Sequence, residues 1–199
     1  MSELPDSPLV RAAFDHVSAH LHEAILNHSV RVARLATAIG ESEQLELDPD
    51  SIWVASLFHD FGTVAGAASG DRFEVVGGNE AAAFLERLSF ADQHEAQEIW
   101  DAIALHTSPH ISESRGGLTR AIRLGVLMDF GEDVLENSAS IRARLETMRP
   151  RLNIEIELAD LVVSQVLDRP EKAPRPSWPR DLYESYLQDP GYRGVNRGF

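Results

Sequence analysis

Residues 52–62 read IWVASLFHDFG, a run in which apolar or small side chains precede an adjacent histidine and aspartate. A helix that is apolar nearly all round, rather than along one stripe, is typical of the core of a domain. Just upstream, Asp48-Pro49-Asp50 has the composition of a helix cap and first turn. The sequence therefore predicts a buried helix that begins near residue 49, ends at Gly62 and carries His59 and Asp60 close to its end.

The pair His59-Asp60 needs a physical explanation at the end of such a helix. An ionised carboxylate in a low-dielectric environment is strongly destabilised unless it is paired or coordinates a metal. An imidazole beside it supplies a second ligand, and a divalent ion accepts both groups. The simpler alternative is a helix-terminal histidine followed by an aspartate that caps the next turn, so the pair alone is weak evidence.

Two other apolar helical segments carry polar residues that complete a metal site. His28 lies in NHSVRVARLA with Arg31 one turn later on the same side, and Asp129 lies in LGVLMDFG. A lone acid in an apolar helix again requires a partner. The set His28, His59, Asp60 and Asp129 is enough to hold one divalent ion and leaves positions for water and substrate.

Helical spacing of apolar residues recurs along most of the chain, and no segment longer than four residues alternates as a strand would. The sequence therefore predicts an all-α fold, with residues 1–170 forming a single helical bundle and residues 171–199 a Pro-rich C-terminal arm. The expected helices, besides the one that ends at Gly62, cover about 8–20, 21–39, 91–107, 117–131, 138–149, 155–167 and 180–188.

Glycines give two further expectations. The segment 62–72, GTVAGAASGDR, is small and Gly-rich, and it fits either a lid over a compact substrate or a plain surface loop. The pair Gly77-Gly78 predicts that a helix starts directly after it, with Asn79 and Glu80 as caps of that helix.

The composition limits the classes of function. The 199 residues are 43% hydrophobic, as expected of one globular domain with a core of its own. Cysteine is absent, which excludes disulfides and thiolate ligands, so a metal site must use His, Asp and Glu. The formal net charge of −14 disfavours nucleic acid and anionic membranes as partners, because both would repel the chain. We therefore expect a small-molecule substrate and neither of those partners.

The sequence also bears on location and assembly. It contains no run of eighteen apolar residues, and its first ten residues, MSELPDSPLV, lack the basic and apolar stretches of a signal peptide. A cytoplasmic protein is expected on these grounds. The Pro-rich arm could pack on a neighbouring subunit, which leaves a homo-oligomer open.

The order His28…His59-Asp60…Asp129 resembles the H…HD…D signature of the HD-domain superfamily. The segment HSVRV, which begins at His28, also matches the H-x-x-R-V opening common in that superfamily. The resemblance covers about residues 20–135. It implies an HD-domain helical bundle with a central metal site.

Two departures from the superfamily pattern narrow the resemblance. Thr63 stands where many HD phosphohydrolases have a lysine that can meet phosphate, and Glu74 stands where members with two metals usually have a histidine. The segments HDFGT, FEVVGGNEAAAFL and AIALHTS together resemble the cyanamide hydratase-like branch. That branch uses one metal ion, typically zinc, to add water to the nitrile carbon of cyanamide.

This resemblance implies roles for individual residues. His28, His59, Asp60 and Asp129 would hold one divalent ion, with zinc expected and Fe, Mn, Co or Ni also compatible with the donors. His106 or Glu74 would transfer protons. Thr63, Phe73 and Arg31 are the candidates for contact with the substrate. His106 could instead contact the substrate, ligate a second ion, or simply end a helix.

Three other functions compete with the hydratase. A metal-dependent phosphohydrolase acting on a nucleotide or another phosphomonoester would need a cation near the metal, for which Arg31 and Arg72 are the nearby candidates in the sequence. A di-iron oxygenase would need a second ligand set, which Glu74 leaves incomplete. A degenerate fold used only for binding conflicts with the presence of all four ligands.

Overall fold

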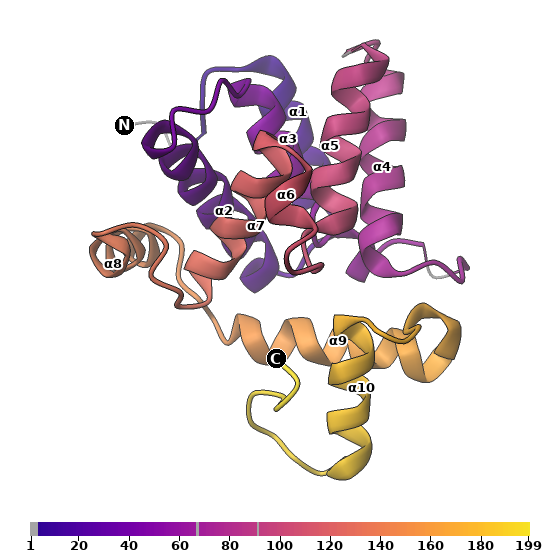
Figure 1. Ribbon diagram of the computed structural model, residues 1–199. Coiled ribbons are helices and arrows are strands. Elements are labelled where there is room, and N and C mark those ends of the chain that lie inside the picture. The colour runs from indigo at the N-terminus through magenta and orange to yellow at the C-terminus, as the bar shows by residue number, and fades with distance from the viewer. Residues whose placement is uncertain (1–3, 67, 91) are drawn as a thin grey trace.

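The computed structural model describes residues 4–66, 68–90 and 92–199, and helices are the only regular secondary structure within these ranges (Figure 1). The all-α prediction is confirmed. The elements are α1 (Pro8–Ser18), α2 (Glu23–Ser42), α3 (Pro49–Phe58), η1 (Phe61–Thr63), α4 (Phe73–Arg87), α5 (Gln93–Leu105), α6 (Ser112–Arg115), α7 (Gly117–Asp129), α8 (Ser138–Met148), α9 (Ile154–Asp168), η2 (Pro170–Lys172) and α10 (Trp178–Gln188).

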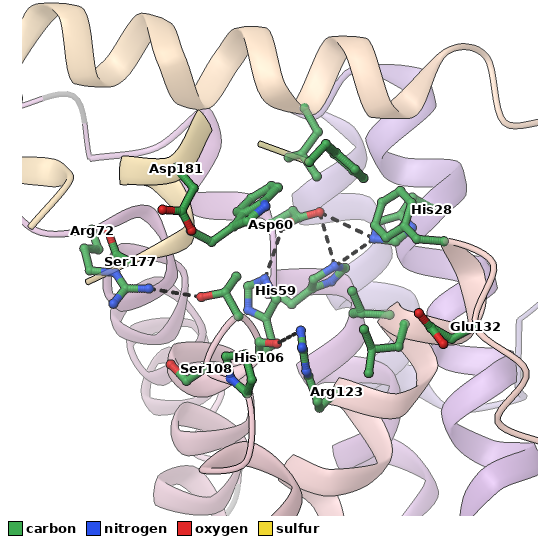
Figure 2. A pocket seen from close by; sticks show the side chains of 18 of the residues that line it. His28, His59, Asp60, Arg72, His106, Ser108, Arg123, Glu132, Ser177 and Asp181 are labelled. Atoms are coloured by element: carbon green, nitrogen blue, oxygen red, sulfur yellow. Dashed lines mark hydrogen bonds and ion pairs between the residues drawn. The ribbon is translucent and has the colours of Figure 1, made fainter. Parts of the chain in front are cut away.

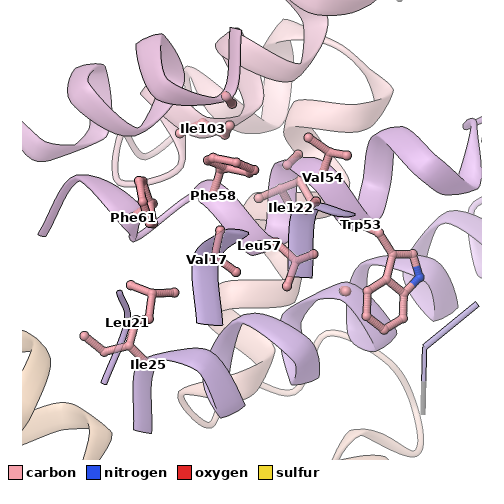
Figure 3. Close-up of a cluster of buried hydrophobic side chains, with 14 of the residues drawn as sticks. Val17, Leu21, Ile25, Trp53, Val54, Leu57, Phe58, Phe61, Ile103 and Ile122 are labelled. Atoms are coloured by element: carbon pink, nitrogen blue, oxygen red, sulfur yellow. The ribbon is translucent and has the colours of Figure 1, made fainter. Parts of the chain in front are cut away.

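Helix α3 lies at the centre of the core, as its apolar sequence predicts, but it ends at Phe58 and not at Gly62, so that His59 and Asp60 come just after it. Every residue from Ser51 to Phe58 is buried, and the helix contacts α1, α2, α4, α5 and α7. Its first turn is capped by Asp48, whose side chain accepts a hydrogen bond from the backbone N–H of Ser51 at 2.7 Å. Figure 3 shows Leu57 and Phe58 of this helix among the apolar side chains that α1, α2, α5 and α7 contribute.

Two helix pairs surround α3. Helix α2 packs along α7, and α4 lies beside α5 (Figure 1). The first pair is close because Gly125 of α7 faces the α2 backbone, where an added Cβ would lie 3.2 Å from the carbonyl oxygen of Val32. These contacts bring the ends of α2, α3, α5 and α7 together.

The prediction that Gly77-Gly78 precedes a helix is wrong, because both glycines lie inside α4. Tertiary contact explains their presence. An added Cβ at Gly77 would lie 2.8 Å from the carbonyl oxygen of Phe58, and one at Gly62 would lie 1.9 Å from that of Phe73. The glycines therefore let the backbone of α4 touch the end of α3.

Asn79 and Glu80 also lie inside α4 and are not the caps that we expected. The residue that precedes the helix is Arg72, whose side chain makes no capping hydrogen bond. The side chain of Asn79 instead accepts a hydrogen bond from Trp100 Nε1 on α5 at 2.9 Å.

The last two long helices form a separate layer across the ends of the others, with α10 packed on α9 (Figure 1). Gln165 of α9 ties this layer to η1, which follows α3, because its side-chain amide donates to the carbonyl oxygens of Gly62 and Thr63, each at 2.8 Å. The division of the chain at residue 170 stays a prediction. No helix among the described residues has the length and apolar character needed to cross a membrane.

Candidate metal centre

Three helix segments bring four polar side chains to one buried point (Figure 2). His28 comes from α2, while His59 and Asp60 follow the last residue of α3, and His106 follows the last residue of α5. All four are almost completely buried. The two helix ends matter, because a residue just past a helix can direct its side chain along the helix axis into the space that the helix faces.

The reactive atoms of these residues are close together. His28 Nε2 and His59 Nε2 are 3.1 Å apart. Asp60 Oδ2 lies 3.2 Å from His59 Nε2 and 3.6 Å from His28 Nε2, and Asp60 Oδ1 lies 3.6 Å from His106 Nε2. The Asp60 carboxylate therefore stands among three imidazoles.

Each imidazole is oriented by a hydrogen bond at its other nitrogen. His59 Nδ1 donates to the carbonyl oxygen of Ser56 and His106 Nδ1 to that of Ile103, both at 2.7 Å. A carbonyl oxygen can only accept, so in the neutral ring the proton is on Nδ1 and Nε2 carries a lone pair. This is the arrangement that metal-binding histidines usually show.

His28 is oriented by a carboxylate instead. Its Nδ1 lies 2.7 Å from Asp129 Oδ2, and Arg31 donates to both oxygens of Asp129, from Nε at 2.7 Å and from Nη2 at 2.8 Å. Although burial would raise it, the neighbouring Arg31 and His28 hold the pKa of Asp129 well below its usual range. Asp129 is therefore an ionised carboxylate that fixes the ring of His28.

The charges of the other site residues are also shifted by their neighbours. Burial would raise the pKa of Asp60, but the adjacent His59 and His106 hold it well below its usual range. Burial lowers the pKa of His28 in spite of Asp129, whereas the Asp60 carboxylate raises the pKa of His59 in spite of burial. An ionised Asp60 at this point attracts a cation.

The arrangement fits a divalent ion. Asp60 Oδ2 is buried and has no hydrogen-bond donor among the described residues. Donor atoms of His28, His59 and Asp60 all lie within 4.8 Å of one another. Imidazole nitrogens bound to one zinc ion at about 2.0–2.1 Å are about 2.9–3.4 Å apart, a range that includes the observed 3.1 Å. These three residues would hold the ion.

Asp129 as the fourth ligand stays a prediction. Its carboxylate is not in the group of mutually close donors, and it contacts His28 at Nδ1 rather than at Nε2, where His59 and Asp60 lie. His106 Nε2 lies 3.6 Å from Asp60 Oδ1, so it stands directly beside the three close donors.

A cavity of about 710 Å³ opens from this point toward α9 and α10. One end consists of His28, His59, Asp60 and His106. The remainder is lined by Arg72 before α4, by the loop after α5, by α7 and its following loop, by α9, and by α10 with the residues next to it. The lining includes Arg72, Thr107, Ser108, Pro109, Ile111, Arg123, Val126, Leu127, Phe130, Glu132, Glu155, Leu158, Pro176, Ser177, Trp178, Asp181 and Phe199.

Four residues that the sequence placed at the substrate do not line this cavity. Glu74 is buried and accepts hydrogen bonds from Arg72 and from Thr107 Oγ1, the latter at 2.6 Å. Thr63 Oγ1 donates to the carbonyl oxygen of Asp60 at 2.7 Å. Phe73 contacts the edge of the His106 ring from behind, with ring centres 5.7 Å apart. These three support residues of the cavity rather than forming its surface.

Arg31 is the fourth. Its side chain is buried, and besides Asp129 it donates to the backbone carbonyl oxygens of Arg149 and Pro150. It borders a second cavity between α2 and α8, not the one that contains His59. Its role in the structure is to hold Asp129.

The segment 62–72 contributes only Arg72 to the cavity lining among its described residues. Lys172 donates to the carbonyl oxygen of Gly66 at 3.3 Å, which attaches the segment to the layer of α9 and α10. The first residues of the segment, Gly62 and Thr63, belong to the buried η1, so only the rest of the segment is a loop, and the lid stays a prediction.

Several cavity residues were missed from the sequence. Arg123 lies in an ordinary amphipathic helix, and nothing in the sequence marks it. Phe130 directly follows Asp129, and this position next to a candidate ligand could have indicated it. Trp178 and Phe199 belong to the Pro-rich arm, where no periodic pattern pointed to a site.

A family model described as HD domain matches residues 25–163, which is well over half of the chain. The match includes His28, His59, Asp60, His106 and Asp129. No curated protein matches the chain.

Proposed function

Since this chain belongs to the HD domain family, whose members hold divalent metal ions, we propose that it is a metal-dependent enzyme that adds water to a small, uncharged substrate. The reacting group would be a nitrile-like carbon, such as that of cyanamide. The resemblance of HDFGT, FEVVGGNEAAAFL and AIALHTS to the cyanamide hydratase-like branch supports this choice of reaction.

The proposal of an uncharged substrate rests mainly on the charged side chains that line the cavity. Within the described residues the lining has two cations, Arg72 and Arg123, against four carboxylates, those of Asp60, Glu132, Glu155 and Asp181. Both arginines already have acidic partners, because Arg72 pairs with Glu74 and Arg123 donates to Glu113 at 3.3 Å. These lining residues therefore offer a phosphate dianion no guanidinium group without an acidic partner, and the proposed metal ion would be the main group to attract it.

The proposed reaction needs a nucleophile, a proton carrier and a cavity that positions the carbon. A divalent ion held by His28, His59 and Asp60 would lower the pKa of water from 15.7 to about 7. In the addition, the water oxygen bonds to the nitrile carbon, one carbon–nitrogen π bond opens, and the nitrogen takes up a proton. A second proton shift gives the amide, so that one water is added in total.

His106 is suited to move the proton. Its Nδ1 is held by the carbonyl oxygen of Ile103, so Nε2 of the neutral ring faces Asp60 and accepts a proton there. Arg123 donates to the carbonyl oxygen of His106 itself at 3.0 Å, which fixes the backbone at this position. His106 would take the proton from water and return it to the substrate nitrogen.

A metal-dependent phosphohydrolase is the second candidate. It is favoured because Arg72 and Arg123 line the same cavity as the histidines. Of these two arginines, only Arg72 was named from the sequence. The phosphohydrolase requires that a phosphate compete with Glu74 and Glu113 for these guanidinium groups. A di-iron oxygenase has less support, because the described residues contain a single group of three close metal donors.

Product assays separate the two candidates. The purified metal-loaded protein would be incubated with cyanamide and phenylcyanamide, and urea and phenylurea measured, in parallel with phosphate release from a panel of nucleoside monophosphates. We expect formation of a urea, abolished by Asp60→Asn and unchanged by His94→Ala, which alters an exposed histidine outside the cavity. Phosphate release without formation of either urea would contradict the proposal.

A further inference from the structure

Seven aromatic rings form a closed circuit of contacts around the cavity. Each ring contacts the next, with ring centres between 4.7 and 6.1 Å apart. In order, the circuit runs through His28, His59, His106, Phe73, Trp178, Phe199 and Phe130, and from there back to His28.

The circuit has two chemically different halves. Three neighbouring rings are the imidazoles that surround Asp60, and the other four are apolar. Six of the seven line the cavity, and Phe73 supports the circuit from behind. The ring circuit is therefore polar and able to hold a metal on one side, and aromatic on the other (Figure 2 shows the polar side). Glu132, Glu155 and Asp181 add carboxylates to the rest of the cavity lining.

The aromatic side is not ordinary core packing. Phe58 and Phe73 are completely or almost completely buried, as core phenylalanines usually are. Phe130, Trp178 and Phe199 are only partly buried, and each lines the cavity. Their edges and faces contact one another in T-shaped geometry, with 4.7 Å between the centres of Phe130 and Phe199 and 5.5 Å between those of Trp178 and Phe199. An apolar surface is thus presented to whatever enters the cavity.

The size of the cavity indicates how much of a ligand this surface could cover. A volume of about 710 Å³ lies in the range of sites that enclose whole organic ligands, about 300–1,000 Å³. Cyanamide has three heavy atoms and would occupy only a small part of it. A molecule that filled the remainder would meet Phe130, Trp178 and Phe199 while its reacting carbon faced the imidazoles.

We propose that the substrate carries an aromatic substituent, which packs against Phe130, Trp178 and Phe199 while the reacting carbon lies beside His59 and His106. Offset and edge-to-face ring contacts favour such a group over an aliphatic chain of equal size. This substrate class rests on the proposed addition of water. The binding of the aromatic group does not depend on the reaction.

Binding of reaction products tests the aromatic group without catalysis. Phenylurea and urea, the products expected from phenylcyanamide and cyanamide, would be titrated by calorimetry into the metal-loaded protein and into the His59→Ala variant. We expect phenylurea to bind both proteins and to bind at least tenfold more tightly than urea, because burial of a phenyl ring stabilises the complex. Equal affinity for urea and phenylurea would overturn the inference.

Variants of the wall identify the contact surface. Trp178→Leu and Phe199→Ala should each weaken phenylurea binding by about three- to tenfold, the range expected from loss of one aromatic pair. Phe90→Ala removes a more exposed phenylalanine outside the cavity and should leave the affinity unchanged. Circular dichroism melting checks that each variant is folded. Unchanged affinity in folded Trp178→Leu and Phe199→Ala would also overturn the inference.

Kinetics then distinguish this inference from the proposed function. Phenylcyanamide should show a higher kcat/KM than cyanamide, with the difference reduced by Phe199→Ala through KM rather than kcat. Hydration of cyanamide alone, without binding of phenylurea, would support the proposed function and overturn the aromatic substituent. Binding of phenylurea that depends on Trp178, without hydration of either cyanamide, would support the aromatic ligand and contradict the reaction.

Discussion

The two sides of the cavity are built in different ways. The polar side consists of His28, His59, Asp60 and His106, all almost completely buried. Hydrogen bonds to α7, α3 and α5 hold the rings of the three histidines. The aromatic side consists of Phe130, Trp178 and Phe199, which are partly buried and lie after α7 or in the layer next to α9. The proposed metal ligands and proton carrier thus lie in the core, whereas the proposed substrate contacts lie at its edge and pack against it.

This difference predicts that the polar side depends on a buried ion pair. Arg31→Met would leave the buried Asp129 carboxylate without its main partner, which destabilises proteins by about 3–5 kcal/mol. Urea denaturation of the wild type and the variant measures this loss. Arg144→Met, which removes an exposed arginine next to the same second cavity, should change the free energy of unfolding by less than about 0.5 kcal/mol. Equal effects of the two substitutions would contradict the role assigned to Arg31.

The backbone contact behind the polar side is the next most sensitive feature. Gly62→Ala would place a Cβ 1.9 Å from the carbonyl oxygen of Phe73, so α4 must move away from the end of α3. We expect a loss of about 3 kcal/mol or more in stability, the upper end of overpacking effects, measured by thermal melting. Gly191→Ala, where an added Cβ would make only an ordinary contact with Asp189 Oδ1 at 3.7 Å, is the matched control and should melt as the wild type does.

Metal removal should destabilise the polar side specifically. A ligand at one hundred times its Kd stabilises the folded state by about 2.7 kcal/mol, so a chelator should lower the Tm of the wild type. His59→Ala, which lacks one of the three close donors, should show no such shift. A chelator effect of equal size in both proteins would place the ion elsewhere.

Acid should weaken the polar side through Asp129. Because Arg31 and His28 lower the pKa of this carboxyl in the folded state, its contribution to stability is complete above its unfolded pKa of about 3.9. That contribution begins to decrease once the pH falls below the unfolded pKa, and it is gone below the folded pKa. Denaturation at pH 7 and pH 3 should therefore show a smaller pH-dependent loss for Asp129→Asn than for the wild type. A loss of equal size in both would contradict the assignment.

The smallest effect is expected on the aromatic side. Trp178→Leu removes a partly buried ring and should cost about 1 kcal/mol or less of stability, with metal content unchanged. Calorimetric melting and metal analysis of the same preparation check both values. A stability loss as large as that of Arg31→Met would remove the distinction between the two sides.

The polar side was largely predictable because its signals are local. An apolar helix that ends in His59-Asp60 leaves a buried carboxylate to be explained, and His28 and Asp129 pose the same question in their own helices. The sequence placed Arg31 on the same face of its helix as His28, and the structure agrees. The sequence also named Arg31 as a candidate for contact with the substrate, whereas in the structure it pairs with Asp129. Its spacing from His28 places both on one side of α2, but Asp129 takes up two of its donor groups.

The rest depended on contacts between distant segments. Gly77-Gly78 looks like a helix boundary in the sequence. In the fold both residues lie inside α4, and the close approach of the Phe58 carbonyl oxygen explains the glycine at position 77. Trp178 and Phe199 reach the cavity because α10 packs on α9, and their Pro-rich segment has no periodicity from which that contact could be predicted.

The most direct test of the metal centre is the metal content of protein purified without chelators. Elemental analysis of the wild type should find one divalent ion per chain, zinc by expectation, and almost none in His59→Ala. His94→Ala, as an exposed control, should retain the ion. Two ions per chain in the wild type, or equal metal content in the wild type and His59→Ala, would contradict a single ion held by His28, His59 and Asp60.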